Sequence, residues 1–565
     1  MKPAIIISLS NILVCVTLLA QESPRPAGSG LIDRFKQFDR NGDGKLTRDE
    51  VADATAFAAA DADKDGGVTV EEYRRYVASR LTNQPASTTA PPVALTPSTS
   101  ANEQSAPAAS ALLDLKFTRD YFPGTRDVNG QWSGGTETLE LCSHNGKLFA
   151  SIGYWMDEPY LEPKGDEPWT GAQVLVRDSA TAPWRVDVSF GKEYKRTEAL
   201  VEITFTTDAQ GVPLTPPVRL LVAAPNYIDI SHEGWTTACT RDDSTGKWHK
   251  SVIAHERYQP SARSLASYRD KVTGVHHIFA GLNHGGIYRG SYDRSVPGGI
   301  RWDPRPERIA KALPGQGRRI YDYSRVLCFA ECNGDLYMAA RITTDETGNP
   351  VDGGLYRRVD GPSPRWELVY RWKIDPQVLQ ARFLRGLTAA PDPKGGNHQV
   401  LIANFEYPGL IVRFDPTRKD DSGSILMEQE LDIKEFFNRA WNTPAARRRG
   451  AIAAYNRFLP VTDSKTGKTV WLCGAWVERP GSPNPPNNGS CYLIRHRDAR
   501  YDWGYIYDPG QPVRAGQRLT GCRDIEPSPF TCEQGRVFYF CGYDGGAGPS
   551  HNTAWIYKGT LEEKP

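Results

Sequence analysis

The sequence predicts a mainly β fold, a seven-bladed β-propeller of four-stranded blades, preceded by a small α-helical unit. Short hydrophobic segments begin at residues 148, 218, 277, 336, 399, 470 and 537, so a similar unit recurs every 59 to 71 residues. The chain of 565 residues also contains 52 Gly and 42 Pro, which is typical of turn-rich β proteins. Residues 31–80 differ, because they are charged, helix-like and carry two acidic loops.

The first 20 residues, MKPAIIISLSNILVCVTLLA, have the layout of a secretory signal peptide, with an early Lys, an apolar stretch, and then small and polar residues. No later apolar run is long enough to span a bilayer. We therefore expect an exported protein, periplasmic or extracellular. The 68 Lys and Arg nearly balance the 67 Asp and Glu, and this net charge of +1 leaves no excess for binding nucleic acid.

Nine cysteines follow the signal segment, an odd number, so at least one is unpaired within the chain. An oxidising compartment favours disulfides, but the sequence leaves their connectivity open.

Composition divides the rest of the chain into three parts. Residues 31–80 form the helical unit. Residues 82–111 are rich in Ser, Thr, Ala and Pro, so they predict a flexible tether. Residues 112–565 contain the repeated hydrophobic segments and form the predicted propeller.

Two loops in the helical unit, residues 39–50 and 61–72, match the pattern D-x-[DN]-x-[DN]-G-x5-E at every specified position. This pattern resembles the EF-hand, which surrounds a calcium ion with six to eight oxygens. Gly44 and Gly66 allow the sharp turn that each loop needs. Lys45 and Gly67 ligate through their carbonyls, and Thr47 and Thr69 act through a bridging water. The expected ligands are Asp39, Asn41, Asp43, Lys45, Thr47 and Glu50 in the first loop, and Asp61, Asp63, Asp65, Gly67, Thr69 and Glu72 in the second.

Only ten residues, VADATAFAAA, separate the two loops, so one helix must serve both. The unit is therefore similar to the short-spaced EF-hand pairs of exported bacterial proteins and to the calcium loops of dockerins. We expect two calcium ions with a structural role, and a docking surface is the alternative. Its expected small core comprises Phe35, Phe38, Phe57, Tyr73 and Val77.

Each repeat of the propeller begins with another strand, upstream of the hydrophobic segment. Six of these strands share a charged residue two positions before a Leu, and the seventh keeps the charge at Glu526. The last repeat has only three strands before the chain ends, so we expect residues 112–121 to supply its fourth strand.

Five of the predicted third strands lead into an Asp followed by a Trp. These pairs are Asp178 and Trp184, Asp242 and Trp248, Asp293 and Trp302, Asp360 and Trp366, and Asp498 and Trp503. The turns resemble the Asp-box of sialidase-like propellers. The resemblance implies a structural role and carries no catalytic residue.

The charged position of each first strand predicts one residue per blade near the mouth of the central channel. An arc of arginines suits carboxylate or sulfate groups, so the expected ligand is an acidic glycan or a protein partner. The alternative is that the arginines and glutamates pair across neighbouring blades as a structural ring. The arginines are Arg263, Arg325, Arg385 and Arg457, and the glutamates are Glu137, Glu198 and Glu526.

An enzyme, either a polysaccharide lyase or a glycoside hydrolase, is the second hypothesis. Candidate catalytic groups are Tyr323, His232, His284 and His551, or the carboxylates of Glu137, Glu198 and Glu526. Trp155, Tyr160 and Trp169 suit stacking on sugar rings. No motif specifies a catalytic constellation, so the sequence favours binding over catalysis.

Overall fold

The computed structural model consists of two compact units. One comprises Met1–Ser105 with Asp375–Gln380, and the other comprises Ala106–Ile374 with Ala381–Pro565. The structure describes residues 39, 43–50, 54–73, 75–76, 115–154, 168–227, 236–254, 261–282, 286–308, 325–341, 353–371, 384–405, 409–440, 451–453, 457–462, 467–477, 490–508, 510, 519, 521–543 and 552–562. The signal-like segment and the predicted tether lie outside these residues.

The N-terminal unit pairs its two acidic loops through a short antiparallel sheet. Strand β1 (Lys45–Thr47) lies against β2 (Gly67–Thr69), and helix α3 (Ala54–Ala60) lies between the loops in sequence. Leu46 and Val68 face each other across this sheet and are buried. Of the five predicted core residues, Phe57 and Tyr73 are buried, while Phe35, Phe38 and Val77 fall outside the described residues.

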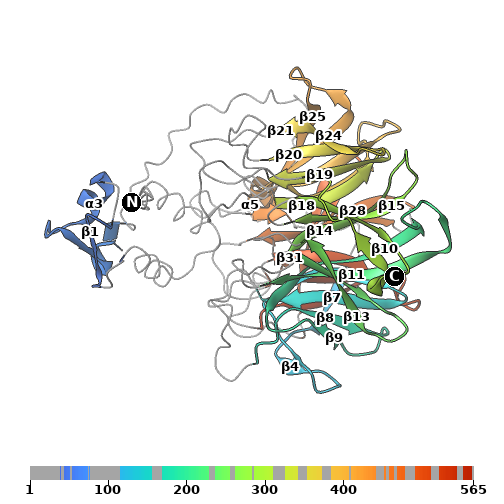
Figure 1. The fold of residues 1–565 in the computed structure, drawn as a ribbon, viewed down its shortest axis with the longest axis horizontal. Helices are drawn as coiled ribbons and strands as arrows, with labels where there is room; N and C mark the ends of the chain where they lie inside the picture. The colour runs from blue at the N-terminus through green and yellow to red at the C-terminus, as the bar shows by residue number, and fades with distance from the viewer. Residues whose placement is uncertain are drawn as a thin grey trace. The chain divides into compact units, whose positions relative to one another are not determined.

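The large unit is built from sets of antiparallel strands (Figure 1). Among the residues that the structure describes, six sets contain four strands and set 6 contains five, and single pairings join sets 1, 2, 6 and 7 into one 17-stranded sheet. Sets 1 to 3 are numbered along the chain. Set 1 contains β6 (Glu137–His144), β7 (Lys147–Gly153), β8 (Gln173–Arg177) and β9 (Arg185–Ser189). Set 2 contains β10 (Tyr194–Thr207), β11 (Pro213–Tyr227), β12 (Thr236–Arg241) and β13 (Trp248–Ala254). Set 3 contains β14 (Ala262–Arg269), β15 (His276–Leu282), β16 (Ile287–Tyr292) and β17 (Ile300–Trp302), with the 3-10 helix η1 (Pro297–Gly299) before β17.

Sets 4 to 6 continue the same pattern. Set 4 contains β18 (Arg325–Cys332), β19 (Asp335–Arg341), β20 (Gly354–Val359) and β21 (Arg365–Arg371). Set 5 contains β22 (Leu384–Pro391), β23 (Gln399–Phe405), β24 (Leu410–Lys419) and β25 (Ile425–Asp432), and helix α5 (Ile433–Ala440) follows it. In set 6, both β26 (Ala451–Ala453) and β27 (Leu459–Thr462) pair with β28 (Thr469–Val477), which is followed by β29 (Ser490–Arg495) and β30 (Tyr501–Ile506).

Set 7 combines the two ends of the β region. Strands β31 (Gly521–Pro527), β32 (Val537–Tyr543) and β33 (Trp555–Leu561) pair in order, and β3 (Leu115–Tyr121) pairs antiparallel with β33. The prediction that residues 112–121 complete the last repeat is therefore confirmed for β3. A short hairpin of β4 (Thr125–Arg126) and β5 (Trp132–Ser133) follows β3.

A β-bulge recurs in the first strand of each set except set 6. The pairing register shifts after Thr138, Thr197, Ala262, Val326, Arg385 and Cys522. In set 6 the first strand is interrupted between β26 and β27 instead. A bulge leaves a residue unpaired and turns its side chain in a new direction, which determines what these strands present.

Among the described residues, no helix is long and apolar enough to cross a membrane.

Candidate functional site

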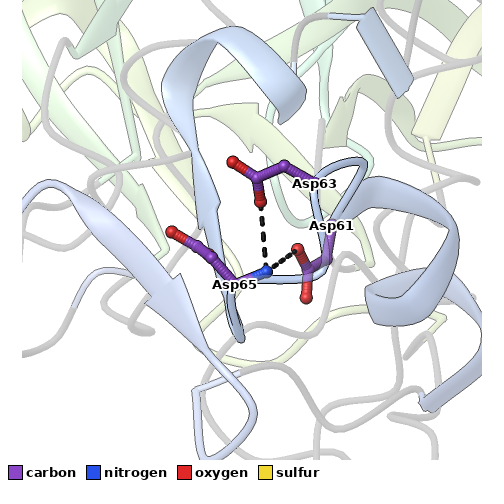
Figure 2. A group of neighbouring side chains, drawn as sticks. All are labelled: Asp61, Asp63 and Asp65. Carbon is purple, nitrogen blue, oxygen red and sulfur yellow. Dashed lines mark hydrogen bonds between the residues drawn. The ribbon is translucent and has the colours of Figure 1, made fainter.

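The second acidic loop brings three carboxylates together (Figure 2). One oxygen from each of Asp61, Asp63 and Asp65 lies within 4.8 Å of the other two. The backbone N–H of Asp65 donates to Asp61 Oδ1 at 3.2 Å and to Asp63 Oδ1 at 3.1 Å, and Gly66 N–H donates to Asp61 Oδ2 at 3.1 Å. These bonds fold the loop around its carboxylates.

Glu72 closes the same loop from its far end. Its Oε2 accepts from the N–H and the hydroxyl of Thr69, at 2.9 and 2.7 Å, and its Oε1 accepts from Ala62 N–H at 3.1 Å. Hydrogen bonds from Thr69 lower the pKa of Glu72 to about 2, so this buried carboxylate is ionised at neutral pH.

The first loop repeats this arrangement where it is described. Asp39 accepts from Asp43 N–H at 3.1 Å and from Gly44 N–H at 2.9 Å, and Glu50 Oε2 accepts from the N–H and hydroxyl of Thr47, both at 2.9 Å. Asn41 lies outside the described residues. The second loop clusters three carboxylates, and both loops carry the Asp, Thr and Glu side chains whose oxygens calcium prefers, so the residues present fit this ion.

One side chain links the two loops. Lys45 Nζ donates to Asp65 Oδ2 at 2.7 Å, although Lys45 belongs to the first loop and Asp65 to the second. The contact raises the pKa of Lys45 and lowers the pKa of Asp65, because each group stabilises the charged form of the other.

A cavity of about 500 Å³ lies in the large unit, and the first-strand region of every set contributes to its wall. The bulges contribute several of the lining side chains. Glu140, Glu198, Arg263, Leu327, Leu387 and Arg523 all stand at register shifts and all line the cavity.

The charged positions that are equivalent in sequence therefore occupy different positions in the structure. Glu198 and Arg263 stand in bulges, whereas Glu137 and Arg385 are paired with the second strands of their sets. In set 7 the bulge holds Arg523, three residues before Glu526.

A chain of ion pairs connects sets 7, 1, 2 and 3. Arg196 bonds Glu137 at 2.7 Å and Glu198 at 2.8 Å, and Arg263 also bonds Glu198. Arg523 extends the chain by bonding Glu137 at 2.9 Å. Burial opposes ionisation of Glu198, but its arginine neighbours outweigh that effect and hold its pKa well below the usual range.

Arg457 forms a second group with two carboxylates of set 7. It bonds Glu526 and lies 3.3 Å from Asp524. These carboxylates also accept from set 1, because Leu141 N–H donates to Asp524 and Ser143 N–H donates to Glu526. The arrangement supports the alternative in which arginines and glutamates pair across neighbouring sets.

Glu140 lies in the bulge of set 1 and lines the same cavity. Its Oε2 accepts from Leu200 N–H at 2.6 Å, and no ion pair to it is found among the described residues. Burial and the nearby charge of Asp524 raise the pKa of Glu140 to about 8. Its carboxyl group therefore retains a proton at neutral pH, as a catalytic acid must.

The remaining predicted site residues are placed as follows. Arg385 lines the cavity, and the backbone of Arg325 starts β18, but the Arg325 side chain lies outside the described residues. Trp169 is buried and stacks on Tyr154 with 3.9 Å between ring centroids, so it is not an exposed platform for sugar. Outside the described residues are Tyr323, His232, His284, His551, Trp155 and Tyr160.

Sequence reasoning missed Glu140, Arg196, Arg523 and Asp524. Glu140 and Arg523 occupy bulges, and the charged-x-Leu pattern contains no signal for a bulge. Arg196 stands two residues before Glu198, and its burial and its contact with Glu137 in the neighbouring set arise only from tertiary packing.

The predicted Asp-then-Trp turns contribute contacts between neighbouring sets. The indole N–H of Trp248 donates to Asp187 of set 1 at 2.9 Å, and that of Trp366 donates to Glu307 of set 3 at 2.9 Å. An arginine on the third strand of the same set bonds the same carboxylate in both cases, Arg241 to Asp187 and Arg358 to Glu307. These two tryptophans thus join neighbouring sets.

The nine described cysteines carry free thiols, eight of them buried and Cys532 exposed. The disulfides that an oxidising compartment favours are absent among these residues.

Comparison with known proteins supports the reading of the N-terminal unit. The EF hand family model matches residues 31–53 and 52–78. This match supports calcium binding, and it covers the N-terminal unit alone. No curated protein matches the chain.

Solved structures similar to the chain include an ancestral GH74 enzyme, with 10% identity and a TM-score of 0.39 over 80% of this chain and 52% of that one. The match thus spans about half the length of that enzyme. Saccharomyces cerevisiae Sqt1 matches at 10% identity and a TM-score of 0.37 over 76% of this chain and 97% of its own. An alpha-L-arabinofuranosidase from Clostridium thermocellum matches at 9% identity and a TM-score of 0.25 over 51% of this chain and 92% of its own.

Proposed function

We propose that this protein binds two calcium ions, one in each EF-hand loop, and that the ions stabilise its N-terminal unit. The observation that carries this proposal is the shared hydrogen-bond pattern of the two loops. In each loop the first Asp accepts from the fifth and sixth residues, and the last Glu accepts from the ninth. The first Asp and the last Glu of each loop are therefore held by the same set of backbone and threonine donors.

Calorimetric titration of the EDTA-stripped protein with CaCl2 tests this proposal. We expect two ions per chain, and loss of one ion in Glu50→Gln and of the other in Glu72→Gln, because each change removes a bidentate ligand. Glu71→Gln is the matched control, since Glu71 is exposed and stands beside the ligand position. Binding that survives both Glu50→Gln and Glu72→Gln unchanged would contradict the proposal.

Export to the periplasm or the extracellular space is part of the same proposal. The composition of residues 1–20 supports it, as does the use of calcium sites, since extracellular calcium is abundant enough to keep weak sites filled. Mass spectrometry of the mature N-terminus tests it, with cleavage shortly after residue 20 as the expected result.

We also propose that the seven strand sets form a closed seven-bladed propeller with the cavity as its channel. Two observations support this: a first-strand region from every set lines the cavity, and β3 joins the last set. An experimental structure with another blade number or an open ring would refute it.

The cavity is the proposed ligand site of the propeller, and an acidic glycan or protein is the proposed ligand. Arg457 supports this class, because 43% of its side chain is exposed while it holds two carboxylates. A carboxylate of the ligand would then bind the exposed part of the Arg457 guanidinium, which Asp524 and Glu526 hold in position. Affinity electrophoresis in uronate, sulfated and neutral polysaccharides tests this. Retardation by the acidic polymers should be lost in Arg457→Met and kept in Arg500→Met, and equal retardation by neutral polymers would exclude acidic selectivity.

A glycoside hydrolase is the second candidate function, favoured by the protonated state of Glu140. In such a reaction Glu140 donates its proton to the leaving oxygen as the glycosidic C–O bond breaks. Water adds to the sugar carbon and gives its proton to a neighbouring carboxylate. A reducing-end assay should show activity that falls at least about a hundredfold in Glu140→Gln and persists in Glu331→Gln, another cavity-lining carboxylate. A rise in absorbance at 235 nm would instead indicate a lyase.

A further inference from the structure

We propose that Lys45 weakens calcium binding at the second loop and couples the two EF-hand loops electrostatically. This inference rests on the proposed function, in which each loop holds one ion. Lys45 has a part in both sites, because its carbonyl is an expected ligand of the first ion while its ammonium group bonds an expected ligand of the second.

The geometry places the ammonium group directly on the second site. Asp65 uses its Oδ1 to accept from Gly67 N–H at 2.8 Å, and its Oδ2 accepts from Lys45 Nζ at 2.7 Å. Both oxygens of this ligand are therefore already bonded. A calcium ion that binds through Asp65 either displaces the ammonium group or shares the carboxylate with it.

Gly67 makes room for this contact. The register of β1 and β2 places Lys45 opposite Thr69 and Thr47 opposite Gly67, and the Lys45 side chain reaches back along the sheet to Gly67. A Cβ atom on Gly67 would lie 3.0 Å from Lys45 Cδ, so any larger residue there would push the lysine stem aside. Gly67 occupies the same loop position as Lys45 and has no side chain, so the second loop sends no matching cation from this position toward the first.

The cation acts on the ion in two ways. It neutralises part of the ligand charge that sets calcium affinity, and it repels the divalent ion. Both effects weaken the second site. The first ion is expected to bind the carbonyl of the same residue. If Lys45 moves when the first ion binds, its ammonium group moves too, which changes the electrostatic potential at the second site.

Calcium titration in a Glu50→Gln background, where the first site is disabled, tests the proposal on the second site alone. Lys45→Met is expected to tighten calcium binding there by about threefold to tenfold, the range expected when one nearby cation is removed. Gly67→Ala should tighten it in the same direction by displacing the lysine. Lys64→Met is the control, because it removes the same charge from an exposed position in the second loop.

Two results would overturn the inference and leave the proposed function intact. One is a calcium affinity of the Glu50→Gln, Lys45→Met variant within twofold of that of Glu50→Gln alone. The other is an equal increase in affinity when Lys64→Met is added instead. Absence of calcium binding in the unmodified protein would overturn both. In the otherwise unmodified chain, Lys45→Met should also tighten the second site, and an unchanged affinity there would contradict the inference.

Discussion

The indole N–H of Trp184 donates to the carboxylate of Asp120, with 2.5 Å between Nε1 and Oδ2. Asp120 belongs to β3, the strand that completes set 7, and Trp184 directly precedes β9 of set 1. Arg177, on β8 of set 1, bonds the same carboxylate. This contact joins the first and last sets of the large unit through the same combination of groups that joins sets 1 and 2.

Trp184→Phe should lower the free energy of unfolding by about 1.5 to 3 kcal/mol, because it removes a hydrogen bond to a largely buried carboxylate that forms an ion pair with Arg177, and it keeps most of the ring. Urea unfolding measures this change. Trp302→Phe is the control and should cost less, since Trp302 donates to the neutral hydroxyl of Ser251. Equal losses in the two variants would show that the charge on Asp120 does not matter.

Glu140 should make the protein less stable as pH rises. Its folded pKa of about 8 lies above the value of about 4.3 for an unfolded Glu, so the folded state binds more protons between these values. The loss of stability caused by Glu140 is absent below pH 4, grows between pH 4 and pH 8, and is complete above pH 8. Unfolding temperatures measured from pH 5 to 8.5 should therefore fall more steeply in the unmodified protein than in Glu140→Gln, and parallel curves would contradict the raised pKa.

His144 should contribute stability at low pH. Glu202 and Asp243 bond its two ring nitrogens at 2.6 and 2.8 Å, and Asn145 and Arg241 complete the surroundings of Asp243. Burial disfavours the charged imidazole, but the two carboxylates outweigh it and raise the His144 pKa. The contribution is complete below about pH 6.5, the unfolded value, and is lost as pH rises through the folded pKa.

Urea unfolding of His144→Gln at pH 6 and pH 8.5 checks this sign. The loss of stability relative to the unmodified protein should be larger at pH 6. His276→Gln is a control of opposite sign, because burial lowers the pKa of His276. His276 lowers the free energy of unfolding as pH falls through 6.5, because the unfolded chain then binds a proton that the folded chain does not. His276→Gln should therefore raise stability more at pH 6 than at pH 8.5.

Cys532 should be the thiol that reacts quickly with a disulfide reagent in the native protein. The other eight described cysteines are buried, and burial raises the pKa of thiols such as Cys239 and Cys332 to about 12. In the chain without residues 1–20, which include Cys15, thiol titration should give about one rapid equivalent in the native state and about nine after unfolding. Cys532→Ser should abolish the rapid phase, and several rapid equivalents in that variant would contradict the burial of the others.

The local part of the candidate site was predictable because its residues are neighbours in sequence. The ligand oxygens of each calcium loop lie within twelve consecutive residues, so their spacing alone predicts both the loop and its ion. The repeated strands could also be predicted from the sequence, because hydrophobic segments and turns recur along the chain. Even the pairing of β3 with β33 followed from counting strands in the last repeat.

Tertiary structure alone decided which charges meet. Glu137 and Arg196 are 59 residues apart, and their contact depends on how neighbouring sets lie against each other. The bulges shift the first strands by a residue or two, which turned Glu140 and Arg523 into the cavity and left Glu137 in the ladder. Sequence determined the calcium loops and the repeated strands, because both depend on local spacing. The partners of the arginines were decided by packing, because a one-residue change of register changes where a side chain points.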